Sequence, residues 1–378
     1  MKSIYLDYNA TTPIAKEVAN AMRPYLDNYF GNPSSAHSFG VKAKMAIEKA
    51  RSQVAGLIGC KSSEIIFTSG GTESNNYAIK GIALANRARG NHIITSAIEH
   101  PAVLEVCKYL QKNGFEISVI PVDKWGVIKI DALKAAIRSN TILISVMHAN
   151  NEVGTIQPIS EIAEIAKEHN IFMHTDAAQS LGKTDVNVQK MNVDLLSIAG
   201  HKLYAPKGVG ALYIRNGVTL EKLIHGADHE QNLRAGTENV LEIVGLGEAA
   251  ELANFNLNEN IKHYTETRNY LQKLLTDAFP DAKINGSLEN RLPNTLSISF
   301  KKIEANRLIH SLQNVAASAG AACHAENISI STVLKAMELP IDFAMGTIRL
   351  STGRETTLKD IEIATGEIIE AIKELERK

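Results

Sequence analysis

The chain has few cysteines and no excess of charge of either sign. Its three cysteines, Cys60, Cys107 and Cys323, are too few for a disulfide framework and lack the spacing of metal ligands. Lysine and arginine together number 40 and aspartate and glutamate 41, so the net charge of -1 does not favour nucleic acid or an anionic membrane as a partner. We therefore expect a small-molecule ligand and no bound metal.

Long apolar runs are also missing. No uninterrupted apolar stretch reaches about 18 residues, the length that spans a membrane, and the opening MKSIYLDYNATTP lacks the apolar core of a secretory signal. The sequence therefore predicts a cytoplasmic protein that does not enter a membrane. With 378 residues, the chain is long enough for a large domain and a smaller one.

Short apolar runs rich in β-branched residues alternate with helical patterns between residues 64 and 214. Seven runs are interpreted as strands: EIIFTSG, NHIITSA, EISVIPV, TILISVMHA, IFMHTD, DLLSIAG and VGALYI. Some of the intervening segments, such as 158–169, are amphipathic. This alternation predicts an α/β fold with a mainly parallel seven-stranded sheet that is covered on both faces.

The pattern changes after about residue 251. A long polar helix is predicted over 258–279, then a strand at NTLSISF, a helix near 305–313, a loop of small residues around Cys323, a strand at GTIRLST and a charged C-terminal helix. These elements predict a smaller α+β domain. We place the large domain at 15–255 and the small domain at 1–14 and 256–378.

Polar residues follow several predicted strands, at the edge where parallel α/β sheets bind ligands. After the first strand, the segment 69–72 (SGGT) precedes a helix, where free N–H groups and hydroxyls form an anion cradle. An ordinary glycine turn with Thr72 as the helix N-cap would explain the same pattern. The residues that follow later strands are His100, Asn150, Asn151, Asp176, Gln179 and Lys202. Taken singly, each has a structural explanation as a turn, a cap or a surface residue.

Taken together, these groups match the needs of pyridoxal 5′-phosphate (PLP). The Lys202 amine would form a Schiff base with the cofactor aldehyde, and burial would lower its pKa so that it serves as nucleophile and base. Asp176 would keep the pyridine nitrogen protonated, which makes the ring an electron acceptor. Gln179 would hydrogen-bond the ring hydroxyl, and His100 would lie on the ring face and handle protons.

The chain resembles the NifS/IscS-type cysteine desulfurases, which are class V aminotransferase-like enzymes of PLP fold type I. The resemblance covers nearly the whole length and rests on ordered segments: YLDYNATTP, FGNPSSAH, TSGGTESNN, EHPAV, MHANNEVG, TDAAQS, GHKLYAPKG, RAGTENV, GAACHA and IRLSTGR.

The resemblance implies a role for each matching residue. Around the ring it implies Lys202 as the Schiff-base lysine, His100 on the ring face, Asp176 at the ring nitrogen, and Gln179 with Asn151 at the ring hydroxyl. At the phosphate it implies Gly71, Thr72 and His201, joined by Thr237 from the second subunit of a homodimer.

Cys323 distinguishes a desulfurase from other enzymes that use this cofactor. The small residues of ASAGAACHAENIS predict a mobile loop that exposes the thiol beside His324, although a small buried loop residue would also fit. Cys60 at a helix end and Cys107 in an amphipathic segment are interpreted as structural.

The predicted reaction converts L-cysteine to L-alanine. Arg349, helped by Asn32, would hold the substrate carboxylate, and Lys202 would remove the α-proton. The Cys323 thiolate would attack the substrate sulfur and keep it as a persulfide while alanine is released. A sulfur-acceptor protein such as an iron–sulfur cluster scaffold would then take the sulfur, for clusters or other thio-cofactors.

Departures from the family pattern keep alternatives open. Ala199 stands where many desulfurases have a serine at the phosphate, which removes a hydrogen bond worth about 1 kcal/mol. The segments GAACH and TIRLSTGRETT also resemble selenocysteine lyases, so release of selenium from L-selenocysteine is the main alternative. Against it, Pro101 after His100 is typical of many NifS-type enzymes. A class V aminotransferase, a carbon–sulfur lyase without a persulfide, or a scaffold that only binds partners are further alternatives.

Overall fold

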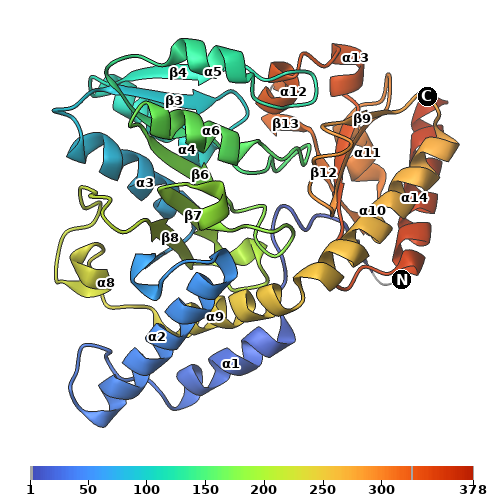
Figure 1. Ribbon diagram of the computed structural model, residues 1–378. Helices are drawn as coiled ribbons and strands as arrows, with labels where there is room; N and C mark the ends of the chain where they lie inside the picture. Colours follow the sequence, from blue (N-terminus) through green and yellow to red (C-terminus); the bar gives the residue numbers. More distant parts are fainter. Residues whose placement is uncertain (1–2, 325–326, 378) are drawn as a thin grey trace.

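The structure is a computed structural model that describes residues 3–324 and 327–377. Figure 1 shows a larger part built on a seven-stranded sheet and, on the right, a smaller part in orange and red that contains both chain ends. The observed α/β architecture confirms the predicted fold class.

The large sheet contains all seven predicted strands. They are β2 (Ile65–Thr68), β3 (His92–Ser96), β4 (Glu116–Ile120), β5 (Thr141–Ser145), β6 (Phe172–Asp176), β7 (Leu195–Ala199) and β8 (Gly210–Ile214). The spatial order is β2-β8-β7-β6-β5-β3-β4. The five neighbouring strands β4, β3, β5, β6 and β7 pair parallel with one another, whereas β8 runs antiparallel to both β2 and β7. The sheet is therefore mainly parallel, as predicted.

Helices cover both faces of this sheet, so each strand buries side chains on two sides. One face packs against α1 (Lys16–Asp27), α2 (Ser38–Ile58), α5 (Ile130–Ala136), α6 (Ile159–Glu168), α7 (Val188–Met191) and α9 (Val240–Phe255). The other face packs against α3 (Gly71–Ala85) and α4 (Pro101–Lys112). Ile65 and Ile66 are adjacent in β2 and belong to opposite cores, which explains why the strands are continuous apolar runs.

The smaller part is built on a four-stranded antiparallel sheet. Its order is β12 (Ser318–Ala319), β15 (Thr347–Ser351), β10 (Thr295–Ser299) and β9 (Lys283–Asn285). Helices α10 (Leu257–Ala278), α11 (Ala305–Ser311) and α14 (Leu358–Glu376) contribute to its core, which also contains Ile4 and Leu6 from the start of the chain. Nearby, β1 (Ile4–Tyr5) pairs with β11 (Val315–Ala316). The domain boundary at residue 255 stays a prediction.

The segment around Cys323 forms strands where a loop was predicted. Strand β13 (Ala321–His324) pairs antiparallel with β14 (Asn327–Ile330), and Cys323 lies opposite Ile328. The loop was predicted from the small residues around Cys323 alone. The segment NISI that follows has alternating isoleucines, which favour a strand and provide a pairing partner. The side chains of residues 321–329, including Cys323 and His324, lie outside the described part of the structure. After the hairpin, the chain forms α12 (Thr332–Ala336) and α13 (Ile341–Ala344).

A buried ion pair ties α2 to the short helix α8 (His229–Asn232). The Arg51 guanidinium forms two hydrogen bonds of 2.7 and 2.8 Å with the Glu230 carboxylate. Glu230 also accepts a hydrogen bond from the backbone N–H of Phe67 in β2, and Arg51 donates to the Ile65 carbonyl. The pair therefore fixes the chain around α8 against the edge of the large sheet.

Replacing Arg51 by methionine is expected to lower the free energy of unfolding by about 3 to 5 kcal/mol, because the Glu230 carboxylate would remain buried without its partner. Urea unfolding followed by circular dichroism measures this loss. The matched control is Glu48→Ala, which removes the half-exposed second partner of Arg51 and should cost less than about 1 kcal/mol. Equal losses in the two variants would contradict the prediction.

Candidate active site

A cavity of about 400 Å³ lies where the parallel strands of the large sheet end. Residues from the start of the chain and from β15 of the smaller part complete its wall. Nine of the residues predicted from the sequence line this one cavity: Gly71, Thr72, His100, Asn151, Asp176, Gln179, His201, Lys202 and Arg349. The fold thus brings together groups that are spread over nearly 280 residues of sequence (349 − 71 = 278).

Three predicted residues are not placed in this cavity. The Asn32 side chain accepts a hydrogen bond from the Ser34 backbone N–H at 2.9 Å, in the connection between α1 and α2. Thr237 lines a separate cavity together with Thr68 and Arg234. The side chain of Cys323 belongs to the residues outside the described part. Within a single copy of the chain, neither Asn32 nor Thr237 reaches the wall around Lys202.

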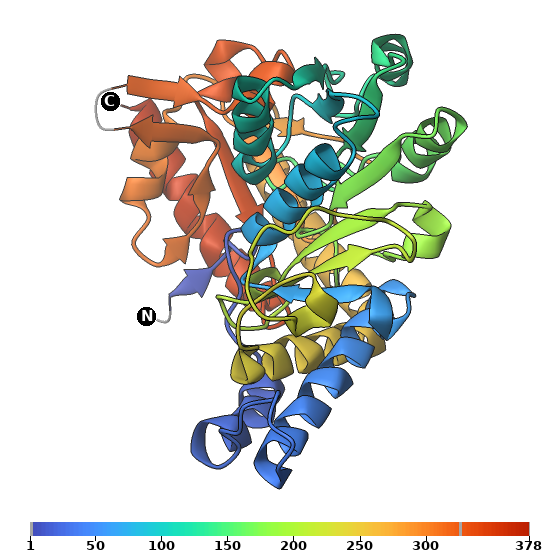
Figure 2. The ribbon, with the colours of Figure 1, turned by 90° about the vertical axis from the view of Figure 1, so that its left-hand side faces the viewer.

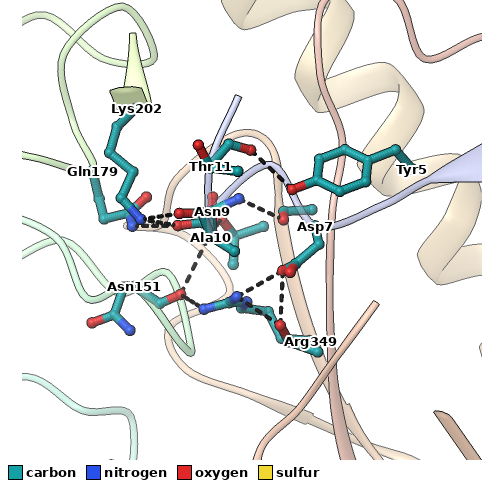
Figure 3. A network of polar contacts seen from close by, with 12 residues as sticks. Tyr5, Asp7, Asn9, Ala10, Thr11, Asn151, Gln179, Lys202 and Arg349 are labelled. Carbon is teal, nitrogen blue, oxygen red and sulfur yellow. Dashed lines mark hydrogen bonds and ion pairs between the residues drawn. The ribbon is translucent and has the colours of Figure 1, made fainter. Parts of the chain in front are cut away.

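Lys202 ends a short 3-10 helix, Gly200–Lys202, that directly follows β7. Its amine donates hydrogen bonds to the backbone carbonyls of Asn9 at 2.5 Å and Ala10 at 2.7 Å (Figure 3). Burial, and then the positive charge of Arg349, lower the pKa of Lys202 to about 8. The amine is therefore closer to its nucleophilic, neutral form at physiological pH than a lysine in water.

The reactivity of the Lys202 amine is expected to follow this lowered pKa. In the cofactor-free protein, acetylation of Lys202 should reach half of its maximal rate near pH 8, since only the neutral amine reacts. The exposed Lys190 is the internal control for the reactivity of the reagent. Pulse labelling at a series of pH values with peptide mass mapping gives both curves. A midpoint for Lys202 at the ordinary lysine value of about 10.4 would contradict the prediction.

Asp176 ends β6 and is held by two donors. Its carboxylate accepts hydrogen bonds from the Asn75 side chain at 2.6 Å and from the Ala178 backbone N–H at 2.9 Å. Asn75 also lines the cavity and was missed by the sequence reasoning. Its position in α3, one turn beyond Gly71 and Thr72, was the available signal, because residues three and four apart share a helix face.

The start of α3 is where the sequence predicts an anion cradle. Gly71 and Thr72 lie in the first turn, where backbone N–H groups have no partner within the helix. The N-cap residue is Gly70, with φ +148°, and no side chain caps the helix, so Thr72 is not the N-cap. A Cβ on Gly71 would approach the Cβ of Ala199 to 3.1 Å, so this wall of the cavity is tight.

Two histidines border the cavity. Burial and the positive charges of Lys202 and Lys207 lower the pKa of His201 to about 4, so its ring is neutral at pH 7. The Nδ1 atom of this ring lies 3.2 Å from the Thr11 hydroxyl. His100 is the N-cap of α4 and accepts a hydrogen bond from the Ala102 N–H at 3.1 Å. Loss of hydration lowers the pKa of His100 as well. His100 therefore starts a helix and also lines the cavity.

Arg349 reaches the cavity from β15. Its guanidinium forms an ion pair with Asp7 at 2.7 Å and donates to the carbonyl of Asn151 at 2.9 Å (Figure 3). Arg349 Nε is buried and has no hydrogen-bond partner among the described residues. Asp7 and Asn9 come from the segment YLDYNATTP, which sequence reasoning used only to recognise the family.

The second asparagine of the MHANNEVG segment lines the cavity, whereas the first does not. Asn150 is fully buried and forms the turn: its side chain donates to the Ile98 carbonyl and accepts from the N–H groups of Glu152 and Val153. Asn150 therefore has the structural role that sequence analysis left open, and Asn151 alone faces the site.

The remaining cysteines are not poised to react. Burial raises the pKa of both Cys60 and Cys107 to about 12, so each keeps its proton at neutral pH. Cys107 is a residue of α4 and lies on its core-facing side. Within residues 3–324 and 327–377, no three metal-ligating side chains gather at one place. Across the same residues, no helix combines the length and apolar character needed to cross a membrane.

Comparison with known proteins agrees with this geometry. The family model described as aminotransferase class-V matches residues 4–363. Cysteine desulfurase IscS of Dictyoglomus turgidum is 52% identical over 375 residues, which cover 99% of this chain and 95% of the relative. Cysteine desulfurase IscS of Methanosarcina thermophila is 48% identical over 379 residues, covering 100% and 93%. The alternative of a selenocysteine lyase receives no support from these relatives.

Solved structures give the same result. A NifS-like protein superposes with a TM-score of 0.93 at 40% identity and covers 99% of this chain and 100% of its own. A NifS-like protein from Rickettsia africae superposes with a TM-score of 0.88 at 33% identity, with full coverage of both chains. The predicted resemblance and fold are confirmed: the chain belongs to the class-V aminotransferase family, among its NifS- and IscS-type cysteine desulfurases.

Proposed function

We propose that this protein is a PLP-dependent cysteine desulfurase, which converts L-cysteine to L-alanine and carries the sulfur as a persulfide on Cys323. The observation that carries the proposal is the meeting of Lys202, Asp176, Gln179 and Arg349 in one cavity. The lysine can react with the cofactor aldehyde, and the acid can pair with the ring nitrogen. The amide can hydrogen-bond the ring oxygen, and the arginine can bind the substrate carboxylate.

The cavity residues fit PLP, on which enzymes of this family depend. Among the described residues, Lys202 has no carboxylate partner, and its amine is held only by two carbonyls, so it is available to a carbonyl carbon. The first turn of α3 offers N–H groups to a phosphate, and Asp176 offers a fixed negative charge. When bound, the cofactor would supply an electron-accepting ring that stabilises negative charge on the substrate's α-carbon.

The chain's own residues would bind the substrate and transfer protons. Arg349 would bind the carboxylate of L-cysteine, since it is fixed by Asp7 and lines the cavity. Lys202, with its lowered pKa, would remove the α-proton and return a proton later. The neutral ring of His100 stands at the same wall and would assist proton transfer.

Strand pairing supports Cys323 as the sulfur acceptor. Ser318 of β12 lies opposite Arg349 of β15, and the Gly320 N–H donates to the Thr347 carbonyl at 2.7 Å. The hairpin that carries Cys323 therefore begins at Ala321, beside the strand that holds the proposed carboxylate ligand. Ser318 lies five residues before Cys323, so the segment that leads to the cysteine passes beside Arg349.

A homodimer would complete the site. The α1–α2 end of the molecule projects below the sheet in Figures 1 and 2. Large apolar side chains are exposed on this end. Phe30 is 81% exposed, Met45 68% and Leu26 65%, and the Phe30 ring packs on Phe39 with centroids 5.6 Å apart. Exposed apolar surface of this kind marks an interface. A second copy seated here would bring its Thr237 to the phosphate, and Asn32 to the substrate.

Turnover of L-cysteine tests the proposed function. Purified protein loaded with PLP should release alanine and sulfide in equal amounts when a thiol reductant is present, because the reductant removes the sulfur held on Cys323. Without reductant or acceptor protein, mass mapping should find the extra sulfur on the peptide that contains Cys323. Activity with L-selenocysteine but not with L-cysteine would overturn the proposal.

We further propose that an iron–sulfur scaffold or a similar protein takes the sulfur.

A further inference from the structure

A second lysine lies behind the wall of the active site. Lys183 is only 4% exposed and does not line the cavity. It follows Gly182, whose φ of +69° turns the chain; a Cβ there would lie 2.6 Å from Leu203 Cδ1. The Lys183 amine donates hydrogen bonds to the side-chain oxygens of Asn9 at 3.2 Å and Gln179 at 3.1 Å.

This buried amine has no acidic partner. Among the ion pairs formed by described residues, none includes Lys183, and both of its acceptors are neutral amide oxygens. Burial and the charges of Lys202 and Arg349 lower the pKa of Lys183 to about 7. A buried amine without a counter-ion does not favour folding, so its presence beside the site indicates a role in function.

The two hydrogen bonds set the orientation of the Gln179 amide. The charged amine can only donate, and the Asn9 carbonyl on the other side can only accept, so Gln179 Oε1 faces Lys183 and its Nε2 faces the Asn9 carbonyl. Gln179 Nε2 donates to the Asn9 carbonyl at 2.9 Å, the same carbonyl that accepts from Lys202 (Figure 3). Asn9 Oδ1 is held by Lys183 and by Asn294.

We propose that Lys183 is a positioning residue that keeps the oxygen of the Gln179 amide turned away from the cavity, so that Gln179 offers its second N–H to an anionic oxygen of the bound ligand. The inference rests on the proposed function, in which that oxygen belongs to the ring hydroxyl of PLP. An amide turned the opposite way would place its own oxygen against this anion and weaken binding.

Lys183→Met tests the role of the amine. We expect the dissociation constant of PLP, measured by titrating the cofactor-free protein, to rise about tenfold, the effect of losing one good hydrogen bond to a charged group. The visible absorbance band of the bound cofactor should shift in the same variant. The melting temperature of the cofactor-free protein should stay within about 3 °C, because the relief of burying an unpaired amine offsets the hydrogen bonds that Asn9 and Gln179 lose. The matched control, Lys190→Met, removes an exposed lysine that pairs with Asp185 and should change none of these quantities.

The mutant cycle with Gln179→Leu shows whether Lys183 acts through the amide. In the Gln179→Leu background, Lys183→Met should weaken PLP binding less than about twofold, since no amide remains to be oriented. A full tenfold loss in that background, or an unchanged dissociation constant in Lys183→Met alone, overturns the inference. If Lys183→Met does not fold, Lys183→Gln, which stays polar but is too short to reach both oxygens, must show the same loss. Wild-type protein that binds no PLP would instead refute the proposed function itself.

Discussion

Replacing Cys323 by alanine is expected to lower the rate of alanine formation from L-cysteine at least about a thousandfold, because no thiolate remains to take the sulfur. Binding of L-cysteine should persist, since Arg349 and Lys202 are untouched. The change in the visible spectrum on adding L-cysteine should therefore survive while turnover stops. Alanine measured by chromatography under steady-state conditions gives the rate.

The matched control for this variant is Cys60→Ala. Burial raises the pKa of the Cys60 thiol to about 12, and the residue does not line the cavity, so its removal should leave turnover unchanged. Sustained alanine formation by Cys323→Ala would contradict the persulfide mechanism. It would favour an aminotransferase or a carbon–sulfur lyase that works without a protein thiol.

Lys202→Ala is expected to abolish turnover, with a loss of at least about 10⁴-fold, since the same amine would attach the cofactor and move the α-proton. Borohydride reduction of the wild-type holoenzyme, followed by peptide mass mapping, should place the cofactor on the peptide that contains Lys202. The control variant Lys190→Ala should retain both labelling and activity, because that lysine is exposed. Cofactor fixed on another lysine would contradict the assignment.

The large sheet could be predicted because its strands carry their own signal. Each strand is buried on both faces, so it appears as a short continuous run of β-branched residues, and the ligand edge of such a sheet follows from strand direction alone. Lys202, Asp176 and His100 were found in this way. The cysteine hairpin was not, because its pairing depends on a partner strand that a composition of small residues does not reveal.

Other parts of the site depend on contacts between distant segments. Asn9 receives a hydrogen bond from Lys183, 174 residues away in sequence, and its own N–H donates to Ser351, 342 residues away. No local pattern marks such a residue. Asn32 and Thr237 pose a different difficulty, since a single copy of the chain leaves both outside the cavity. The roles proposed for them would require a second copy, about which neither periodicity nor spacing carries information.

The contacts of the first dozen residues have a practical consequence for anyone producing the protein. This stretch accepts both hydrogen bonds of the Lys202 amine, pairs Asp7 with Arg349 and hydrogen-bonds Thr12 to the His201 carbonyl. Proteolytic trimming beyond Thr12 would strip the lysine, the arginine and the histidine of their supports in a single cut, while the seven-stranded sheet kept its core. A preparation clipped there would look folded by spectroscopy and yet be inert, so intact mass should be checked before any assay.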